Sequence, residues 1–191
     1  MTKSRLEAFS DGVLAVIITI MVLELKVPYG AGLDALLALS PIFLSYVLSF
    51  IFVGIYWNNH HHMLHASHKV NGLVMWANLH LLFWLSLVPF TTAWLNESFY
   101  AATPVAAYGV VLLMSGIAYY FLARSLIALH GKDSTLAKAI GGDIKGIASL
   151  VIYAVAVVLA GYIPYASMAL YAVVALMWLV PDRRIEKAMK E

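Results

Sequence analysis

Long stretches without any formally charged residue divide this chain. Asp, Glu, Lys and Arg are absent from residues 35–59, 70–96, 98–123 and 146–181. About 20 predominantly apolar helical residues cross the hydrocarbon core of a bilayer, so each of the first three stretches predicts one membrane-spanning helix. The fourth would measure about 54 Å as one helix, which exceeds the bilayer thickness. It therefore predicts two helices, with a turn between Gly161 and Tyr165.

A shorter apolar run, residues 12–23, lies between Asp11 and Glu24 near the N-terminus. This run would cover only about 18 Å as a helix, so we expect a first helix that extends beyond it, over about residues 5–27. Glu7 and Asp11 precede the run and no small-residue cleavage site follows it, which argues against a signal peptide. The acidic side chains of this helix are therefore expected to face protein or water rather than lipid.

The expected fold is all-α, a polytopic membrane protein whose single domain, residues 1–191, contains six transmembrane helices. Their approximate bounds are 5–27, 35–59, 70–96, 101–124, 143–161 and 166–181. Of the 12 Lys and Arg residues, 11 flank these helices on one side of the membrane and only Lys26 lies on the other. Because cytoplasmic loops collect positive charge, both termini are expected to lie in the cytoplasm.

The composition excludes several classes of protein. With 63% hydrophobic and 12% charged residues, the chain differs from soluble domains, which average about 45–50% apolar and about 25% charged residues. It has no cysteine and no Walker, Rossmann, nucleophile-elbow or His-Glu-x-x-His motif, so we expect neither enzyme activity nor a cofactor. The basic residues are spread over four cytoplasmic segments, which gives no support to nucleic-acid binding.

Histidines are concentrated at the cytoplasmic end of the second helix. Five of the seven lie there: His60, His61, His62, His65 and His68. His61 and His65 share a helical face, as metal ligands can, but no Asp or Glu is nearby. A structural polar network is therefore preferred over a metal site or a proton sensor. Within the third helix, Asn78 and His80 are most simply interpreted as interhelical hydrogen-bonding groups.

The first helix carries one continuous face at about 100° per residue. Its members are Arg5, Phe9, Gly12, Val16, Thr19, Ile20 and Leu23. From the residues alone, packing against neighbouring helices is the simpler interpretation of this face. In the alternative, copies of the helix surround an axis, and Val16, Ile20 and Leu23 form hydrophobic rings that gate a pore by dewetting. Thr19 would add a ring of hydroxyl groups, and Glu24 would concentrate cations at the outer mouth.

The residues from Arg5 to Asp11, Arg-Leu-Glu-Ala-Phe-Ser-Asp, precede the first apolar run directly. They resemble the Arg-x-x-x-Phe-Ser-Asp signature of the transmembrane protein 175 family, potassium-permeable channels of lysosomes and prokaryotes. Residues 52–61, Phe-Val-Gly-Ile-Tyr-Trp-Asn-Asn-His-His, are also similar to the end of that family's second helix. The short, six-helix layout resembles the prokaryotic form, which assembles as a homotetramer in the cytoplasmic membrane.

The resemblance implies that the first helix of each subunit lines a pore for K⁺, with bulky side chains in place of a carbonyl filter. It assigns the inner constriction to Val16, the following hydroxyl to Thr19 and the further hydrophobic layers to Ile20 and Leu23. A network that positions this helix is implied for Arg5, Phe9, Ser10, Asp11, Trp57, Asn58, His60 and His61. Valine is shorter than the family's isoleucine or leucine at position 16, which predicts a modest preference for K⁺.

Two other classes stay open. A proton-coupled transporter would use Glu24, His80 and the histidines from His60 to His68. A haem or quinone membrane protein would require facing histidines inside the bundle, where only His80 is expected.

Overall fold

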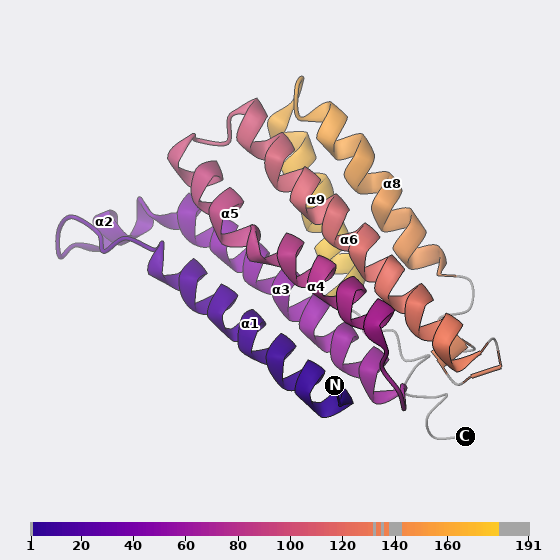
Figure 1. Ribbon diagram of the computed structural model, residues 1–191. Helices are drawn as coiled ribbons and strands as arrows, with labels where there is room; N and C mark the ends of the chain where they lie inside the picture. Colours follow the sequence, from indigo (N-terminus) through magenta and orange to yellow (C-terminus); the bar gives the residue numbers. More distant parts are fainter. Residues whose placement is uncertain (1, 132, 135, 138–142, 180–191) are drawn as a thin grey trace.

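The computed structural model describes residues 2–131, 133–134, 136–137 and 143–179. Its helices are α1 (Lys3–Leu23), α2 (Leu33–Leu37), α3 (Ser40–His65), α4 (Gly72–Ser86), α5 (Val88–Glu97), α6 (Ala102–His130), α8 (Ile144–Leu159) and α9 (Pro164–Leu179) (Figure 1). The described residues contain no strand, so the all-α prediction is confirmed. The expected end of the last helix at 181 lies outside the described residues. So do the basic residues Lys132, Lys138, Arg183, Arg184, Lys187 and Lys190.

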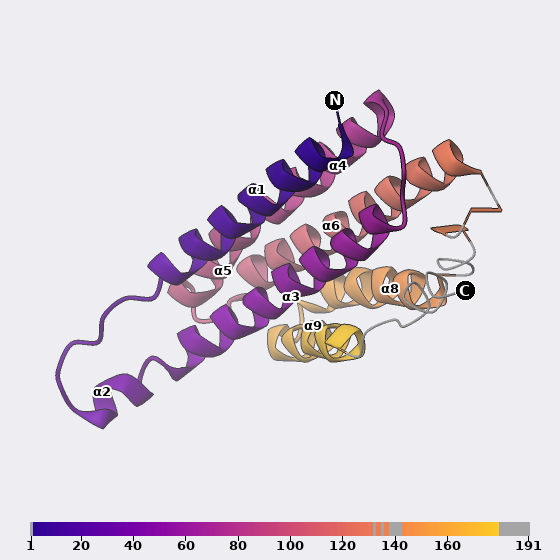
Figure 2. The same ribbon diagram turned by 90° about the horizontal axis from the view of Figure 1, so that it is seen from below.

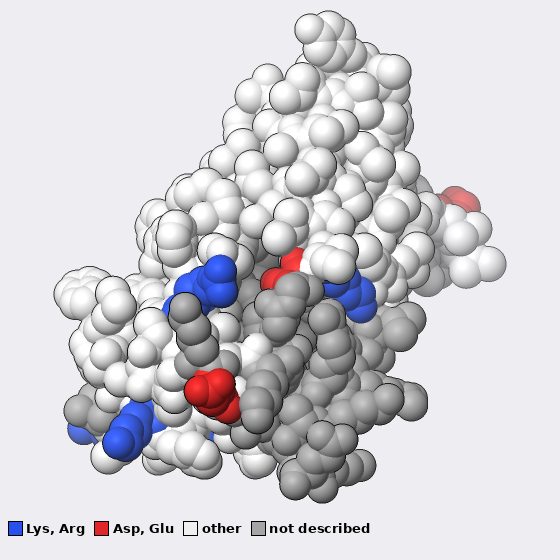
Figure 3. Space-filling view, turned by 90° about the vertical axis from the view of Figure 1, so that its right-hand side faces the viewer, with Lys and Arg blue, Asp and Glu red and all other residues white. Residues whose placement is uncertain are grey.

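Four segments are long and apolar enough to cross a bilayer: α1, α3, the stretch Gly72–Glu97 that contains α4 and α5, and α6. The apolar helices α8 and α9 have 16 residues each, which corresponds to about 24 Å. Figure 3 shows a face that is uncharged over most of its height, with charged side chains mostly toward its lower part. These features describe a membrane protein. The count of six spans, with both termini in the cytoplasm, stays a prediction.

The observed helix ends differ from the expected ones where proline intervenes. The first helix ends at Leu23 rather than 27, and the N–H of Leu25 donates to the carbonyl of Val22 in a tighter turn. Pro28 also disfavours a helical conformation of the residue before it. The long helix expected from residue 35 begins at Ser40, because Pro41 occupies its first turn, where the missing N–H has no intrahelical partner to lose.

At their C-terminal ends, two helices continue further than expected. α3 reaches His65 rather than 59, and α6 reaches His130 rather than 124. The expected bounds marked the ends of apolar runs, but backbone hydrogen bonds also form beyond the hydrocarbon region. The histidine cluster is therefore largely part of α3.

The stretch 70–96, expected as one helix, is divided at Leu87. Pro89 has no N–H to offer the preceding turn, and the N–H of Leu87 donates to the carbonyl of Trp84 at 3.2 Å. By contrast, the turn expected after residue 160 is present. The N–H groups of Tyr162 and Ile163 donate to the carbonyl of Leu159 at 2.9 and 2.8 Å, and α9 begins at Pro164.

The helices form one bundle with α1 on one side and α8 on the other (Figures 1 and 2). α1 packs against α3, α4 and α5, whereas α6 packs against α4, α5, α8 and α9. The buried apolar side chains form two clusters, one mainly among α1, α3, α4 and α6 and the other mainly among α3, α5, α6, α8 and α9. α1 therefore contributes one side to the core and leaves its other side open.

Candidate pore-lining face of helix one

The open side of α1 carries the continuous face predicted from the sequence. All seven members of that face are exposed, with exposed fractions of 58% for Val16, 44% for Ile20 and 75% for Leu23. The side chains that α1 buries recur every three or four residues: Leu6, Ser10, Leu14, Ile17 and Met21. A long apolar face left open by its own subunit must meet lipid or another protein.

Two polar groups accompany the apolar face. The hydroxyl of Thr19 donates to the carbonyl of Ala15 at 2.9 Å, so its oxygen lone pairs remain directed away from its own helix. Glu24 caps the C-terminal end of α1 and is exposed. From Val16 to the C-terminal end of α1, the face thus combines three bulky apolar side chains and one hydroxyl, with the Glu24 carboxylate at its end.

A buried chain of hydrogen bonds holds α1 against α4 and α3. The hydroxyl of Ser10 donates to the carbonyl of Leu6 at 2.8 Å and accepts from the amide Nδ2 of Asn78 at 2.9 Å. Asn78 Oδ1 lies 2.7 Å from His60 Nε2, so this histidine nitrogen carries the proton. Ser10, Asn78 and His60 are 0%, 2% and 3% exposed, respectively. The chain joins the buried side of α1 to α4 and, through Asn78, to α3.

A second polar link lies at the edge of the same contact. The indole N–H of Trp57 donates to Asp11 Oδ1 at 3.0 Å. The ring of Trp57 stacks on that of His61, with 6.2 Å between the centroids and an interplanar angle of 27°. Trp57 is about half exposed, so this link is more accessible than the Ser10–Asn78–His60 chain.

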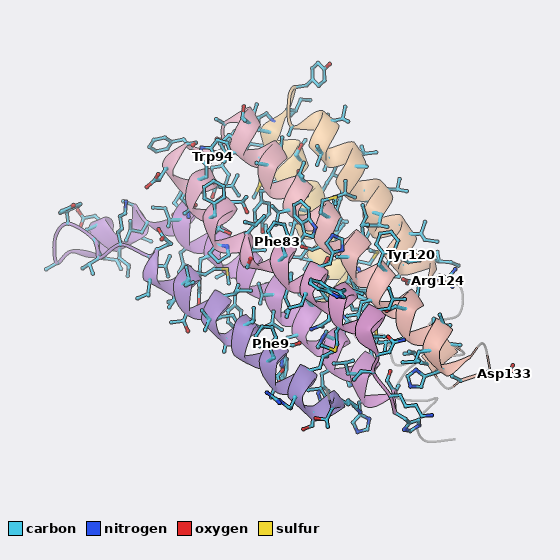
Figure 4. All side chains as sticks on the ribbon, in the orientation of Figure 1. Phe9, Phe83, Trp94, Tyr120, Arg124 and Asp133 are labelled. Carbon is cyan, nitrogen blue, oxygen red and sulfur yellow. The ribbon has the colours of Figure 1, made fainter. Side chains whose placement is uncertain are left out.

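The structure thus brings together part of the set expected to position helix one. Ser10, Asp11, Trp57 and His60 form hydrogen bonds between helices, and His61 joins them through its ring. Arg5, Phe9 and Asn58 make no hydrogen bond to these groups among the described residues. Arg5 and Phe9 belong to the exposed face instead (Phe9 is labelled in Figure 4).

Asn78 was not assigned to this network from the sequence. The sequence predicts an interhelical hydrogen-bonding role for Asn78, and the structure confirms it, since Asn78 joins Ser10 of α1 to His60 of α3. Its position inside an uncharged stretch indicates that its side chain is hydrogen-bonded, because an amide in the hydrocarbon region requires a partner. The identity of that partner depends on how the helices are placed.

The other histidines do not converge on one site. The described residues contain no group of three or more His, Asp or Glu that could hold a metal ion. His80, which was expected to bond between helices, instead accepts from the indole N–H of Trp84 at 3.0 Å within α4. His130 Nε2 accepts from the backbone N–H groups of His68 and Lys69 at 3.0 and 3.1 Å. These contacts give structural roles to several histidines.

A cavity of about 50 Å³ lies among α3, α6, α8 and α9, which is room for a few water molecules. Tyr56, Tyr120, Tyr153 and Trp178 contribute aromatic walls, and the Arg124 side chain covers the ring of Tyr120 (Figure 4). The residues that line this cavity include neither Glu24 nor any histidine. The cavity is therefore separate from both the α1 face and the groups expected of a transporter.

Comparison with known proteins identifies the family. Residues 5–89 match the family model described as endosomal/lysosomal potassium channel TMEM175. Over 191 residues, the whole of both chains, the sequence is 54% identical to a protein named potassium channel from Chryseobacterium sp.. It is 40% identical over 99 residues, 49% of each chain, to a protein named potassium channel from Chamaesiphon minutus.

The human protein named endosomal/lysosomal proton channel TMEM175 is 35% identical over 96 residues, which is 44% of this chain and 19% of the human one. The fold is similar to the crystal structure of a lysosomal potassium-selective channel TMEM175 homolog from Chamaesiphon minutus, with a TM-score of 0.81 and 28% identity. That match covers 94% of this chain and 97% of the other. The resemblance predicted from the Arg5–Asp11 motif is confirmed, and the family consists of channels rather than enzymes. The chain belongs to the TMEM175 family of ion channels.

Proposed function

We propose that this protein is a passive, potassium-permeable cation channel of a prokaryotic cytoplasmic membrane. Four copies surround an axis, and α1 of each copy lines the pore. The observation that carries this proposal is the exposed apolar face of α1, which its own subunit leaves uncovered while the opposite side of the helix is fixed by buried hydrogen bonds. The potassium channel names of its bacterial relatives favour the same ion.

In this channel, side chains rather than backbone carbonyls restrict the pore. Rings of Val16, Ile20 and Leu23 make a narrow apolar path in which water is unstable, so an ion passes only when the rings are wetted. K⁺ gives up its hydration shell at a lower cost than the smaller Na⁺, so such a constriction favours K⁺. The Thr19 ring offers hydroxyl oxygens to a partly dehydrated ion, and Glu24 raises the cation concentration at the outer mouth.

Ion flux into liposomes tests the proposal. Purified protein is reconstituted, and a K⁺ gradient drives uptake while a proton ionophore carries the compensating charge. We expect K⁺ flux that needs no coupled ion and is faster than Na⁺ flux under the same gradient. No flux above that of empty liposomes, from protein shown to be folded and oligomeric, would refute the channel. Uptake against a gradient that collapses with the proton gradient would favour a transporter instead.

The transporter alternative has less support from the arrangement of its groups. Glu24 lies at the outer end of α1, whereas His80 lies within α4 and pairs with Trp84 of the same helix. The histidines of α3 lie near the opposite end of the bundle from Glu24, and only His60 among His60, His61 and His65 is buried. None of these groups lines the cavity among α3, α6, α8 and α9.

Lengthening the side chain at the innermost ring is expected to narrow it. Val16→Ile adds one methylene per subunit, and a buried methylene is worth about 0.8 kcal/mol. We expect K⁺ conductance to fall by about threefold and the preference for K⁺ over Na⁺ to rise. Single-channel recording in planar bilayers measures both quantities. Val22→Ile is the control, since Val22 is exposed on α1 but does not belong to the predicted face. Equal changes in conductance and in K⁺ preference for Val16→Ile and Val22→Ile would contradict the assignment of Val16 to the pore constriction.

Removing the Asp11 carboxylate is expected to affect stability rather than selectivity. Asp11→Ala deletes the acceptor of the Trp57 indole N–H, at a cost of about 1 kcal/mol for a partly exposed bond to a charged group. Thermal unfolding of the detergent-solubilised oligomer is expected to shift to lower temperature, with an unchanged permeability ratio. Glu7→Ala, which removes a partly exposed ion pair with Lys3 of the same helix, is the control. A stable oligomer with altered ion preference would argue against a positioning role.

A further inference from the structure

Two exposed stripes of large aromatic side chains run along the bundle, with members seven residues apart. One lies on α3 and the other on the α4–α5 segment. The α3 stripe is Phe43, Phe50 and Trp57, and the α4–α5 stripe is Trp76, Phe83 and Phe90. Seven residues correspond to almost two full turns, so the first set occupies one side of α3, and Trp76 and Phe83 occupy one side of α4. Phe90 follows at the same spacing in α5.

The exposed faces of α8 and α9 have a different character. Apart from Tyr165 at the start of α9, their large exposed hydrophobic side chains are aliphatic: Ile144, Ile147, Val151, Val155 and Val158 on α8, and Val173, Leu176 and Leu179 on α9. Aliphatic faces suit lipid chains, whereas each large aromatic side chain can bury about 150–250 Å² and pair with another ring across a contact between two proteins. The two aromatic stripes therefore differ from the lipid-facing surface in chemistry as well as in place.

Both stripe-bearing segments flank α1. Trp57 of the α3 stripe donates to Asp11 of α1, and Asn78 of α4 donates to Ser10 of α1. α1 packs against α3, α4 and α5; it lies beside α3 in Figure 1 and beside α4 and α5 in Figure 2. When α1 faces a symmetry axis, one flank of each subunit faces the next copy and the other flank faces the previous copy. Rotational symmetry then brings unlike surfaces together.

We propose that the α3 stripe of one subunit packs against the α4–α5 stripe of its neighbour. This inference rests on the proposed channel, because it takes the pore axis from the α1 face. The partner is a second copy of this chain, and the interface repeats around the ring until it closes. The aromatic side chains seal the spaces between subunits on the lipid side of the α1 helices.

The heights of the two stripes along the membrane normal fix which residues meet. Within one subunit, Ser49 bonds Thr92 at 2.8 Å and His60 bonds Asn78 at 2.7 Å, so α3 and α4–α5 run antiparallel with these pairs at equal height. Rotation about the membrane normal preserves height. Phe50 of one copy therefore lies level with Phe90 of the next. By the same registration, position 61 of one copy lies level with position 79 of the next.

Disulfide trapping tests this registration in a chain that has no natural cysteine. Chains that each carry a single substitution are co-expressed in pairs, so that any disulfide between different positions joins two chains. We expect Phe50→Cys to cross-link with Phe90→Cys, and His61→Cys to cross-link with Leu79→Cys, on mild oxidation. The crossed pairs, positions 50 with 79 and 61 with 90, differ in height by about 16 Å. Their yield of cross-linked dimer is expected to be at least about tenfold lower.

The outcomes separate this inference from the proposed function. Passive K⁺ flux by the reduced protein with cross-links in neither matched pair would overturn the interface and leave the channel intact. Equal cross-linking of matched and crossed pairs would overturn the registration. If the oligomer forms the matched cross-links but conducts no ion, the result would support the proposed interface and refute the proposed channel. Each cysteine serves in one matched and one crossed pair, so one unstable variant does not decide the result.

Discussion

Ile20→Ser is expected to raise K⁺ conductance by about tenfold and to remove most of the preference for K⁺ over Na⁺. A tenfold change corresponds to a barrier lower by about 1.4 kcal/mol. The substitution replaces an apolar ring in the middle of the α1 face by hydroxyls that hold water, so the constriction no longer dries. Ile20 is 44% exposed in the subunit, so serine there leaves the packing of α1 on its neighbours largely intact.

The matched control is Val22→Ser on the same helix. Val22 has the same exposed fraction, 44%, and the same change of an apolar side chain to a hydroxyl, but it lies off the predicted face. Its conductance is expected to stay within about twofold of the wild type, which corresponds to less than about 0.5 kcal/mol in the barrier. Leu23→Ala extends the test to the outer ring, where conductance is also expected to rise. If Val22→Ser changed conductance as much as Ile20→Ser, the pore-lining face would be assigned to the wrong side of α1.

Asn78→Ala is expected to destabilise the folded protein more than any other polar substitution at the α1 contact. It removes a buried amide that bonds two groups, leaving the His60 ring N–H without its acceptor and the Ser10 hydroxyl oxygen without its donor. The combined loss is about 2–3 kcal/mol for unpaired buried groups. Thermal unfolding followed by circular dichroism in detergent measures this loss, and size-exclusion chromatography reports the accompanying loss of oligomer.

His61→Ala provides the control for this prediction, because His61 is adjacent to His60 in the chain but exposed. Its effect on the unfolding temperature is expected to be small, since an exposed ring contact is replaced by water. Asn78→Ala protein that unfolds at the wild-type temperature would show that the buried chain does not hold α1. Equal destabilisation by His61→Ala would place the important histidine at 61 rather than 60.

Several parts of the fold could be predicted from the length, hydropathy and charge of stretches of the sequence. Uncharged stretches of sufficient length predicted apolar helices, because a lipid environment leaves no other partner for the backbone. The stretch 146–181 was too long for one helix, and the turn between α8 and α9 lies where Gly161 and Pro164 interrupt it. The exact helix ends were less predictable, because hydropathy marks the edge of the apolar run rather than the last hydrogen-bonded turn.

For the candidate site, periodicity alone produced the α1 face, and the Arg5–Asp11 motif indicated the family. The sequence did not reveal whether this face of α1 packs in the core or stays open, because periodicity shows which residues share a face but not which helices contact that face. That choice came from the tertiary structure, which buries the side of α1 that contains Ser10 and Ile17 and exposes Val16 and Ile20.

The sequence by itself therefore determined the helices, their apolar surfaces and the residues that share a face, since these depend on local spacing and hydropathy. Only the tertiary structure decided that Asn78 joins Ser10 to His60, and that His60 rather than another histidine of the cluster lies inside the bundle. Those pairings connect residues 18 and 68 positions apart. They arise from the relative rotation and height of whole helices, which packing of the complete bundle sets.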